Sequence, residues 1–371
     1  MDLIILMLDV YFYCQFNNTG IGRHCHNVFD SLAKLASPSI RLHYIDQTNI
    51  DAVRGAVTSR GSHPKIHAFF RRAPAHLVNL CSGTRFVWWA FESDSLPTKW
   101  LKDVQPYDEI WVPSHWGRTV LLAHGVSQNR IRVVELGVNT ARFYPSPINH
   151  DGFIFLSVGK YEKRKSTDEI VEAFTQEFPL CDYPSVQLWL KADFPLFPSR
   201  VPQLAERLRY DGRIRVLSGE ATDETMAQVY GMADAFVFPS KAEGFGLPCI
   251  EAIACGVPVI ASDVTGQSTF LRRIPGLFEP VAYNRIPIID EDYRHFYEAD
   301  YGNLDFGTWA APDISSLRNA MRKVFENPEK SRALALRASM VIRDEFSWEV
   351  IAGKTLAGIK ELHLRSAPFD S

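Results

Sequence analysis

The chain has 371 residues, of which 46% are hydrophobic and 22% charged, a composition that excludes a disordered polypeptide. Its formal net charge is −3, from 40 basic and 43 acidic side chains. Nucleic acid is therefore not an expected partner, because nucleic-acid-binding domains carry a marked basic excess. At this length a single hydrophobic core has usually stopped growing, so two domains are expected.

The charge is divided unevenly along the chain. Residues 1–147 have a net charge of +4 and residues 148–371 a net charge of −7. The positive excess lies in residues 51–76, where five basic side chains accompany one acidic side chain. This segment predicts peripheral contact with an anionic membrane surface or a phosphate-bearing lipid, and a solvated loop is the alternative.

The six cysteines are widely spaced and form no C-x-x-C pair. This pattern predicts small buried thiols in a reducing compartment and not a disulfide framework. The apolar run from Leu3 to Leu8 has no basic residues before it and ends at Asp9, so it is too short for a signal peptide or a membrane span. We expect a cytoplasmic protein.

Short apolar runs alternate with helical patterns in both halves. In the first half the expected strands are Leu3–Leu8, Phe86–Ala90, Glu109–Val112 and Ile131–Val134, and the expected helices are Arg23–Lys34 and Trp116–His124. In the second half the expected strands are Phe153–Val158, Val186–Leu190, Ile214–Leu217, Ala235–Phe238 and Val257–Ala261. The helices expected there are Asp168–Phe174, Asp223–Tyr230, Ile250–Cys255, Ile314–Phe325, Arg332–Ile342 and Trp348–Leu364. The alternation predicts an α/β protein with two doubly wound, Rossmann-like domains, and the linker-like composition of residues 144–147 puts their boundary after residue 147.

The most informative motif, PSKAEGFGLPCIEA, spans residues 239–252 and joins an expected strand to an expected helix. Gly244 and Gly246 permit tight backbone geometry, and the loop amides with the helix N-terminus can bind an anion or a hydroxyl group. Glu243 in the loop and Glu251 on the helix can reach the same site, where carboxylates would accept hydrogen bonds from sugar hydroxyls. A capped helix with two solvated glutamates is the alternative.

A second motif, SVGKYEKRK, spans residues 157–165 at the end of an expected strand. Ligands bind beyond the carboxyl ends of parallel strands, and four basic residues there predict an anion such as a diphosphate. They are Lys160, Lys163, Arg164 and Lys165. A solvated basic turn is the alternative.

A third motif places Gly20 and Gly22 between the first expected strand and helix. It resembles part of a dinucleotide fingerprint, but the third glycine is missing, so it indicates NAD only weakly. We interpret it as a loop whose backbone contacts a phosphate or a sugar.

Together these motifs resemble the retaining nucleotide-sugar glycosyltransferases of family four, which have the GT-B fold. The resemblance covers nearly the whole chain and includes YDEIWVPS at 107–114, ELGVN at 135–139, FYP at 143–145 and FSWE at 346–349. It implies two Rossmann-like domains facing a central cleft. Residues 1–147 would bind the acceptor and residues 148–345 the donor, and a terminal helix within residues 346–371 would pack back on the first domain.

The resemblance also implies roles for single residues. Glu251 would hold the donor ribose. The donor sugar would be held by Glu243 with Gly244, Phe245, Gly246 and Leu247. The family's clamp on the diphosphate, an Arg and a Lys, corresponds to Lys160 and Lys165 here. Lys160 keeps the charge but loses the bidentate fork of Arg, for which Arg164 could compensate. Gly20 and Gly22 match the family's glycine-rich loop.

Two departures from the family pattern stand out. The segment ELGVN lacks the histidine of the common signature, and the first-domain histidine near the donor sugar has no clear match. In its place, WWAFESDSLP at residues 88–97 resembles a subset of the family, and we assign Glu92 to contact with the acceptor or the donor sugar. A helix-capping loop is the alternative for Glu92.

The implied activity is transfer of a hexose, with retention, from a nucleotide-diphosphate donor to a saccharide or lipid-linked saccharide. GDP-mannose or a UDP-sugar would be the donor, and no cofactor or metal is expected. Asp290-Glu291-Asp292 has the D-x-D form of metal-dependent transferases but lies in an irregular acidic segment. The alternatives are a non-catalytic partner subunit, a nucleotide-sugar epimerase or phosphorylase of the same fold, and an NAD dehydrogenase.

Overall fold

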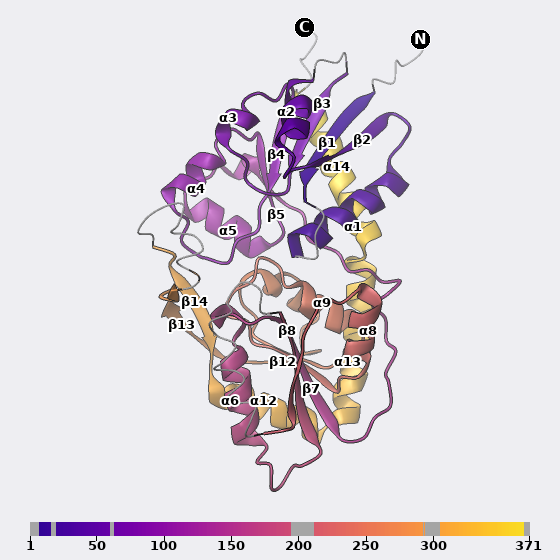
Figure 1. Ribbon diagram of the computed structural model, residues 1–371, viewed down its shortest axis with the longest axis vertical. Coiled ribbons are helices and arrows are strands. Elements are labelled where there is room, and N and C mark those ends of the chain that lie inside the picture. Colours follow the sequence, from indigo (N-terminus) through magenta and orange to yellow (C-terminus); the bar gives the residue numbers. More distant parts are fainter. Residues whose placement is uncertain are drawn as a thin grey trace. The chain divides into compact units, whose positions relative to one another are not determined.

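The computed structural model describes residues 7–15, 20–59, 63–193, 211–291, 293 and 305–366. The chain divides into two compact units (Figure 1). Unit 1 comprises residues 1–91, 96–137 and 346–371, and unit 2 comprises residues 92–95 and 138–345. The chain therefore passes between the units four times, and four residues from the N-terminal half belong to unit 2.

Unit 1 is built on a parallel sheet with the strand order β2-β1-β3-β4-β5-β6. Its strands are β1 Leu8–Cys14, β2 Ile40–Asp46, β3 Lys65–Phe69, β4 Thr84–Trp88, β5 Glu109–Val112 and β6 Ile131–Val133. Its helices are α1 Gly20–Leu35, α2 Ile50–Thr58, α3 Ala75–Val78, α4 Thr98–Asp103, α5 His115–Ala123 and α14 Trp348–Ser366, with a 3₁₀ turn η1 at Gln128–Arg130.

The terminal helix α14 is part of unit 1, where it packs against α1. Ion pairs hold it to β5 and β6: Arg365 pairs with Glu109 and Glu361 with Arg132. Gly137 lies directly against Trp348 at the start of this helix, and a Cβ there would be 2.6 Å from a ring carbon. Helix α14 therefore belongs to the same unit as the N-terminal sheet.

Unit 2 has a second parallel sheet, with the order β12-β11-β10-β7-β8-β9, and a two-stranded antiparallel sheet, β13-β14. Its strands are β7 Phe153–Lys160, β8 Val186–Asp193, β9 Ile214–Leu217, β10 Ala235–Phe238, β11 Val259–Ala261, β12 Glu279–Pro280, β13 Tyr283–Pro287 and β14 Thr308–Pro312. Its helices include α6 Thr167–Glu177, α8 Asp223–Gly231, α9 Leu247–Ala254, α10 Ser268–Leu271, α12 Ile314–Glu326 and α13 Pro328–Glu345, with 3₁₀ turns η2 at Lys163–Lys165 and η4 at Thr265–Gln267.

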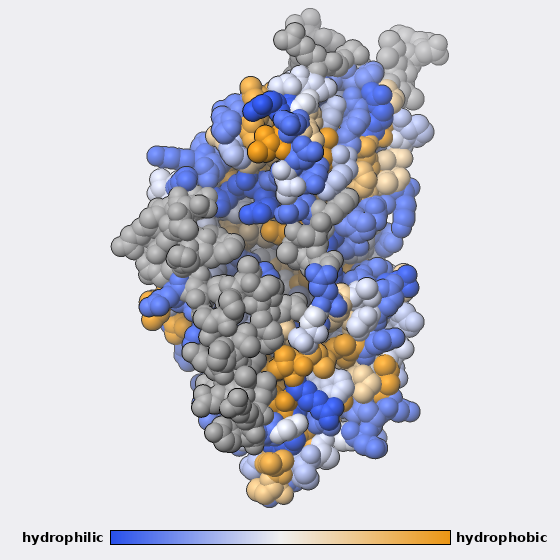
Figure 2. Space-filling view, in the orientation of Figure 1, coloured by the Kyte–Doolittle hydropathy of each residue, from blue (hydrophilic) through white to orange (hydrophobic). Residues whose placement is uncertain are grey.

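The core of unit 2 lies between its parallel sheet and the helices α6 and α12 (Figure 1). Inward-facing Phe155, Leu188 and Val237 from three strands meet Phe174 and Met321 from the two helices, and all five are buried. On the face shown in Figure 2, hydrophilic side chains predominate and the apolar ones form separate patches. The two doubly wound parallel sheets confirm the α/β class.

The first strand differs from the prediction. The apolar run at residues 3–6 lies outside the described residues, and β1 begins at Leu8. Asp9 was expected to end the strand, but it is buried inside it because Arg41 and His43 on β2 lie 2.9 Å from its carboxylate. A guanidinium and an imidazole on the neighbouring strand satisfy this buried carboxylate, which from the sequence alone looks like the end of the strand.

The division between the units falls at 137/138, ten residues before the expected boundary. The proline-containing segment 144–147 has the composition of a linker, but its surroundings are packed on unit 2. Phe143 is buried with its ring 5.9 Å from that of Tyr230, and the Ile148 amide donates to the carbonyl of Gly231. Pro145 lies against Gly256.

Candidate functional site

Glu243 is held in a short loop between β10 and α9. Gly246 has φ +105, a left-handed conformation that favours glycine, and it caps α9. Gly266 packs so closely beneath the loop that a Cβ there would lie 2.2 Å from the carbonyl oxygen of Gly244. The Glu243 amide donates to the Thr265 hydroxyl at 3.0 Å, and the Gly266 amide donates to the Glu243 carbonyl at 2.9 Å. The loop is therefore fixed on both sides before any ligand binds.

The Glu243 carboxylate meets the basic motif at the end of β7. Lys165 Nζ lies 2.5 Å from Glu243 Oε1, and Arg164 Nη1 lies 3.2 Å from Oε2. The Ser240 hydroxyl also donates to Oε1, at 2.6 Å. Burial alone would raise the pKa of Glu243, but the two cations and these hydrogen bonds lower it to about 2. The structure thus joins the loop motif and the basic motif, 78 residues apart, into one buried charged cluster.

Arg164 has three partners for its guanidinium in this cluster. Its guanidinium donates to the Ala242 carbonyl at 2.6 Å and to Glu162 at 2.8 Å, besides pairing with Glu243. Burial would lower its pKa, but the surrounding carboxylates raise it well above the ordinary value. Arg164 therefore braces the Glu243 loop with bonds on three sides, and its part in diphosphate binding stays a prediction.

Lys160 lies at the last residue of β7, beside β8. In contrast to Lys165, it has no ion-pair partner in the part of the chain that the structure describes, and it is partly exposed. An unpaired ammonium at the carboxyl end of a parallel strand suits an incoming anion. Between Lys165 and α6, Ser166 has φ 58, an uncommon left-handed conformation for a residue other than glycine.

Glu251 lies one turn into α9 and is buried. The Tyr230 hydroxyl donates to its Oε2 at 3.0 Å and contacts the Pro248 carbonyl oxygen at 3.1 Å. Tyr230, on α8, therefore orients this carboxylate. Sequence reasoning missed Tyr230 because a tyrosine at helical spacing is indistinguishable from an ordinary core residue.

Glu92 belongs to unit 2 with the cluster, although it lies in the N-terminal half of the sequence. Burial raises the pKa of its carboxyl, which is within electrostatic reach of Arg164 and Glu243. The predicted aromatic-Glu motif therefore brings a third carboxyl group to the same region. Of the predicted residues, the structure gathers Glu92, Arg164, Lys165 and Glu243.

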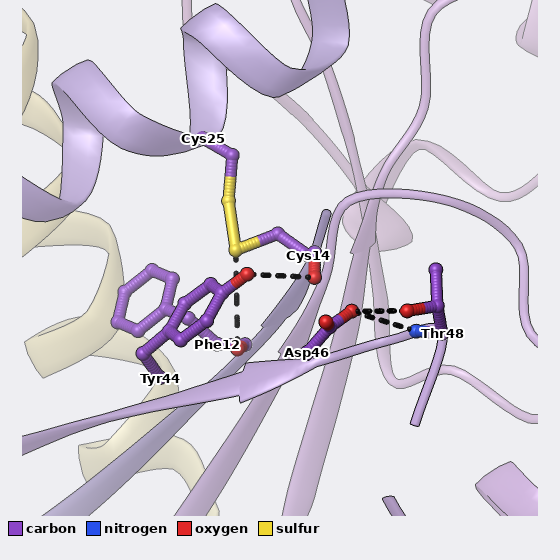
Figure 3. Close-up of a disulfide and its surroundings, with 6 residues drawn as sticks. All are labelled: Phe12, Cys14, Cys25, Tyr44, Asp46 and Thr48. Carbon is purple, nitrogen blue, oxygen red and sulfur yellow. Dashed lines mark hydrogen bonds between the residues drawn. A yellow bond between two sulfur atoms is a disulfide. The ribbon is translucent and has the colours of Figure 1, made fainter. Parts of the chain in front are cut away.

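Gly20 and Gly22 form the first turn of α1 in unit 1, and residues 16–19 before them lie outside the described residues. A disulfide joins Cys14, at the end of β1, to Cys25 on α1 (Figure 3). The expectation of unpaired buried thiols was therefore wrong for this pair. An eleven-residue separation is typical of no disulfide motif, and the two sulfur atoms meet because the end of β1 lies beside α1.

Two of the five basic residues in segment 51–76 are not free to attract a membrane. Lys65 is buried and donates to the Ser59 carbonyl, and Arg72 pairs with Asp103 while stacking on Trp100. Arg54 and Arg71 are exposed, and Arg60 lies outside the described residues. No helix in the described ranges is long and apolar enough to cross a bilayer.

The first aspartate of the D-x-D segment makes a hydrogen bond within its own segment. Asp290 accepts a hydrogen bond from the Tyr293 amide at 2.8 Å, and Asp292 lies outside the described residues. Among the residues that the structure does describe, no three His, Cys, Asp or Glu side chains are grouped so that they could hold a metal ion.

Residues 139–273, which include the whole charged cluster except Glu92, match the family described as Glycosyl transferases group 1. The O-antigen chain mannosyltransferase B of Escherichia coli is 39% identical over 110 residues, 30% of this chain and 28% of that protein. The D-inositol 3-phosphate glycosyltransferase 1 of Catenulispora acidiphila is 28% identical over 198 residues, 47% of each chain. The chain thus spans less than half the length of these curated relatives.

Solved structures resemble the chain over nearly its full length. A sucrose-phosphate synthase from Thermosynechococcus elongatus has a TM-score of 0.69 at 19% identity, covering 97% of this chain and all of that one. Alr3699/HepE of Anabaena, crystallised with UDP and glucose, has a TM-score of 0.70 at 14% identity, covering 95% and 99%. At these identities the likeness shows the fold, and it confirms the GT-B architecture. The chain is thus similar to the glycosyl transferases group 1 family over residues 139–273, and its fold is that of the GT-B proteins.

Proposed function

We propose that the protein is a retaining, metal-independent hexosyltransferase of glycan or polysaccharide biosynthesis. Its donor is a nucleotide-diphosphate sugar, GDP-mannose or a UDP-sugar, and its acceptor is a saccharide or a lipid-linked saccharide. Relatives named mannosyltransferases support GDP-mannose, and a structural neighbour crystallised with UDP and glucose supports a UDP-sugar. The protein requires no cofactor besides the donor.

The observation that carries this proposal is the buried cluster of Lys165, Arg164 and Glu243. A carboxylate held ionised in a buried loop by two cations is preorganised to accept hydrogen bonds from sugar hydroxyls. Lys165, and Lys160 at the end of β7, supply positive charge for a diphosphate. Glu251, oriented by Tyr230, accepts hydrogen bonds from the ribose.

These groups suit a reaction in which charge develops on the leaving diphosphate. The bond between the anomeric carbon and the diphosphate oxygen breaks, and the diphosphate leaves with the electron pair. The acceptor oxygen attacks from the same face, and its proton passes to the departing phosphate oxygen. Lys160, Lys165 and the amides of residues 244–247 stabilise this charge, an effect worth about 10²–10³ in rate for a single donor. Glu92 contacts the reacting sugar or the acceptor hydroxyl.

A thermal-shift panel of UDP, GDP, ADP and dTDP identifies the base. The matching nucleotide sugar is then incubated with free and lipid-linked saccharides, with and without EDTA, and the anomeric configuration of the product is determined by NMR. Transfer that inverts the configuration, or that stops with EDTA, would contradict the mechanism.

The site assignment is tested with Lys165→Ala and Glu251→Ala. Both variants should lose transfer by at least about a hundredfold while keeping their fold. Lys323→Ala is the matched control, because Lys323, on α12, also pairs with a glutamate of unit 2, Glu279, but its side chain is exposed. Near-wild-type turnover in both site variants would refute the site assignment. A wild-type protein that shows no transfer with any nucleotide sugar would instead favour a non-catalytic partner subunit.

A further inference from the structure

The segment of residues 92–95 is bound by the small sheet β13-β14. Asp94 accepts hydrogen bonds from the amide and the hydroxyl of Thr308, each at 2.6 Å, and Arg285 lies 3.3 Å from the same carboxylate. The fully buried Ser93 hydroxyl donates to the Phe306 carbonyl. Trp309 Nε1 donates to the Glu92 carbonyl at 3.0 Å. Three successive residues are thus each tied to the strand β14 or the residue pair preceding it.

The contact is close enough to restrict the residue types on both sides. Gly307 has φ +73, and a Cβ there would lie 2.1 Å from Asp94 Oδ1 and 3.0 Å from Ser95. Glycine is therefore required for both the conformation and the space. Residues 92–95 and the strand β14 therefore fit closely against each other, although they are more than 200 residues apart in the sequence.

The same strand is attached to the charged cluster. The Ala310 amide on β14 donates to the Lys241 carbonyl at 3.0 Å, and the Lys241 amide donates to the Arg164 carbonyl at 2.8 Å. Lys241 is itself fixed, because its ammonium pairs with Glu169 on α6 at 2.6 Å. A short series of hydrogen bonds, one from the Trp309 indole and two between backbone groups, therefore connects Glu92, through β14 and Lys241, to Arg164.

We infer that Asp94 is a positioning residue: by docking on Thr308 and Arg285 it fixes the Glu92 carboxyl beside the Arg164–Lys165–Glu243 cluster. The inference rests on the proposed function, in which Glu92 contacts the reacting groups. Asp94 itself faces β13-β14 and not the cluster. Loss of its contacts would let residues 92–95 leave β14 and would carry Glu92 away from the cluster.

The test compares Glu92→Gln, Asp94→Ala and the double variant in the full chain. Displacing a reacting group by about 1 Å can cost about a hundredfold in rate, so each single variant should lose 10- to 100-fold in kcat, with the KM for the donor within about twofold of wild type. The double variant should be no slower than Glu92→Gln. Once the Glu92 carboxyl is gone, releasing residues 92–95 from β14 has no further carboxyl to displace. Additive losses, or an Asp94→Ala variant with unchanged kcat, would overturn the inference.

Thr308→Val provides a second, milder variant, since it removes one hydroxyl and keeps the side-chain shape. It should lower kcat in the same direction as Asp94→Ala and to a smaller degree. Glu279→Gln is the matched control, because it breaks an ion pair on the same unit without touching β13-β14. Its kcat should equal that of the wild type, and a loss as large as that of Asp94→Ala would count against a specific role for Asp94.

Hydrogen–deuterium exchange provides a readout that does not depend on turnover. In Asp94→Ala, exchange should increase together in residues 92–97 and 305–310 and remain unchanged in residues 239–251. Unchanged exchange in both segments would refute the docking. If the wild type transfers no sugar at all, the proposed function fails, whereas a wild type that is active beside an unaffected Asp94→Ala variant refutes only this inference.

Discussion

Lys165 Nζ lies 2.5 Å from Glu243 Oε1, and this contact joins the two most informative motifs of the sequence. Both side chains are largely buried, at 11% and 7% exposure, so the pair is poorly screened by solvent. An ion pair of this kind orients its members, and removing one partner leaves the other charge buried and uncompensated. The predictions below begin from this pair.

The ionisation of Glu243 should make the free energy of unfolding depend on pH. Its folded pKa of about 2 lies below the ordinary value of 4.5, so it stabilises the folded state above pH 4.5, and this stabilisation is lost as the pH falls toward 2. A shift of this size corresponds to about 3 kcal/mol. Glu243→Gln should therefore be less stable than wild type at pH 7 and flatter in its pH dependence between pH 5 and 2, measured by urea unfolding. Parallel curves for the two proteins would contradict this.

Gly137→Ala should destabilise unit 1. The new methyl group would overlap the Trp348 ring, and overpacking a rigid contact costs about 1–3 kcal/mol. Gly55→Ala, within α2, is the matched control, because a Cβ there meets nothing within 4 Å and alanine is the better helix former. The midpoint of thermal unfolding should fall for the first variant and remain or rise for the second. Equal shifts would mean that the contact with Trp348 is not rigid.

The Cys14–Cys25 disulfide closes a short loop between β1 and α1. Cross-linking a loop of this length stabilises the folded chain by about 3 kcal/mol through the entropy of the unfolded state. Reduction should lower the free energy of unfolding of the wild type by about this amount and leave the Cys14→Ser/Cys25→Ser variant unchanged. Thiol titration of the unfolded protein should find four thiols before reduction and six after it, in keeping with the four free cysteines. Six thiols in both states would exclude the bond.

Tyr230→Phe should weaken nucleotide binding with little change in fold. The substitution removes the hydroxyl that donates to Glu251 and leaves a buried carboxylate less well satisfied. Loss of such a hydrogen bond costs about 1–3 kcal/mol, so the Kd for the preferred nucleotide should rise about fivefold or more. Isothermal titration calorimetry measures it. Tyr183→Phe is a suitable control, since that hydroxyl accepts a hydrogen bond from Arg322 on α12 and makes no contact with Glu251 in the described residues. An unchanged Kd for Tyr230→Phe would contradict the proposed contact between Glu251 and the ribose.

The fold was largely predictable because most strands are apolar runs flanked by turn residues. Four of the expected strands, such as Glu109–Val112 and Ala235–Phe238, have the same bounds as the strands in the structure or differ from them by one residue. The strands β2 and β3 were missed because one face of each carries polar side chains, among them Arg41, His43 and His67. Tyr11 stacks between the two histidine rings, so aromatic packing from a neighbouring strand covers part of this polar face, and no single segment reveals that packing.

The candidate site was predictable where one segment carries several signals, as around Glu243 and Lys165. It was not predictable where the partner is remote. The hydrogen bond from Tyr230 to Glu251 spans 21 residues, and the bonds from Asp94 to Thr308 span 214. No local pattern encodes these pairings, which depend on the order of strands in the sheet.

Residues 92–95 belong to unit 2 although they lie within the N-terminal half of the sequence, and this matters for building chimaeric proteins. A chimaera made by joining residues 138–345 to the N-terminal half of a relative would leave residues 92–95 behind. The amide of Thr308 and the indole of Trp309 would then face a foreign segment that was not selected to bind them. Unit 2 is discontinuous in the sequence, so exchanging it between relatives requires that residues 92–95 be transferred together with residues 138–345.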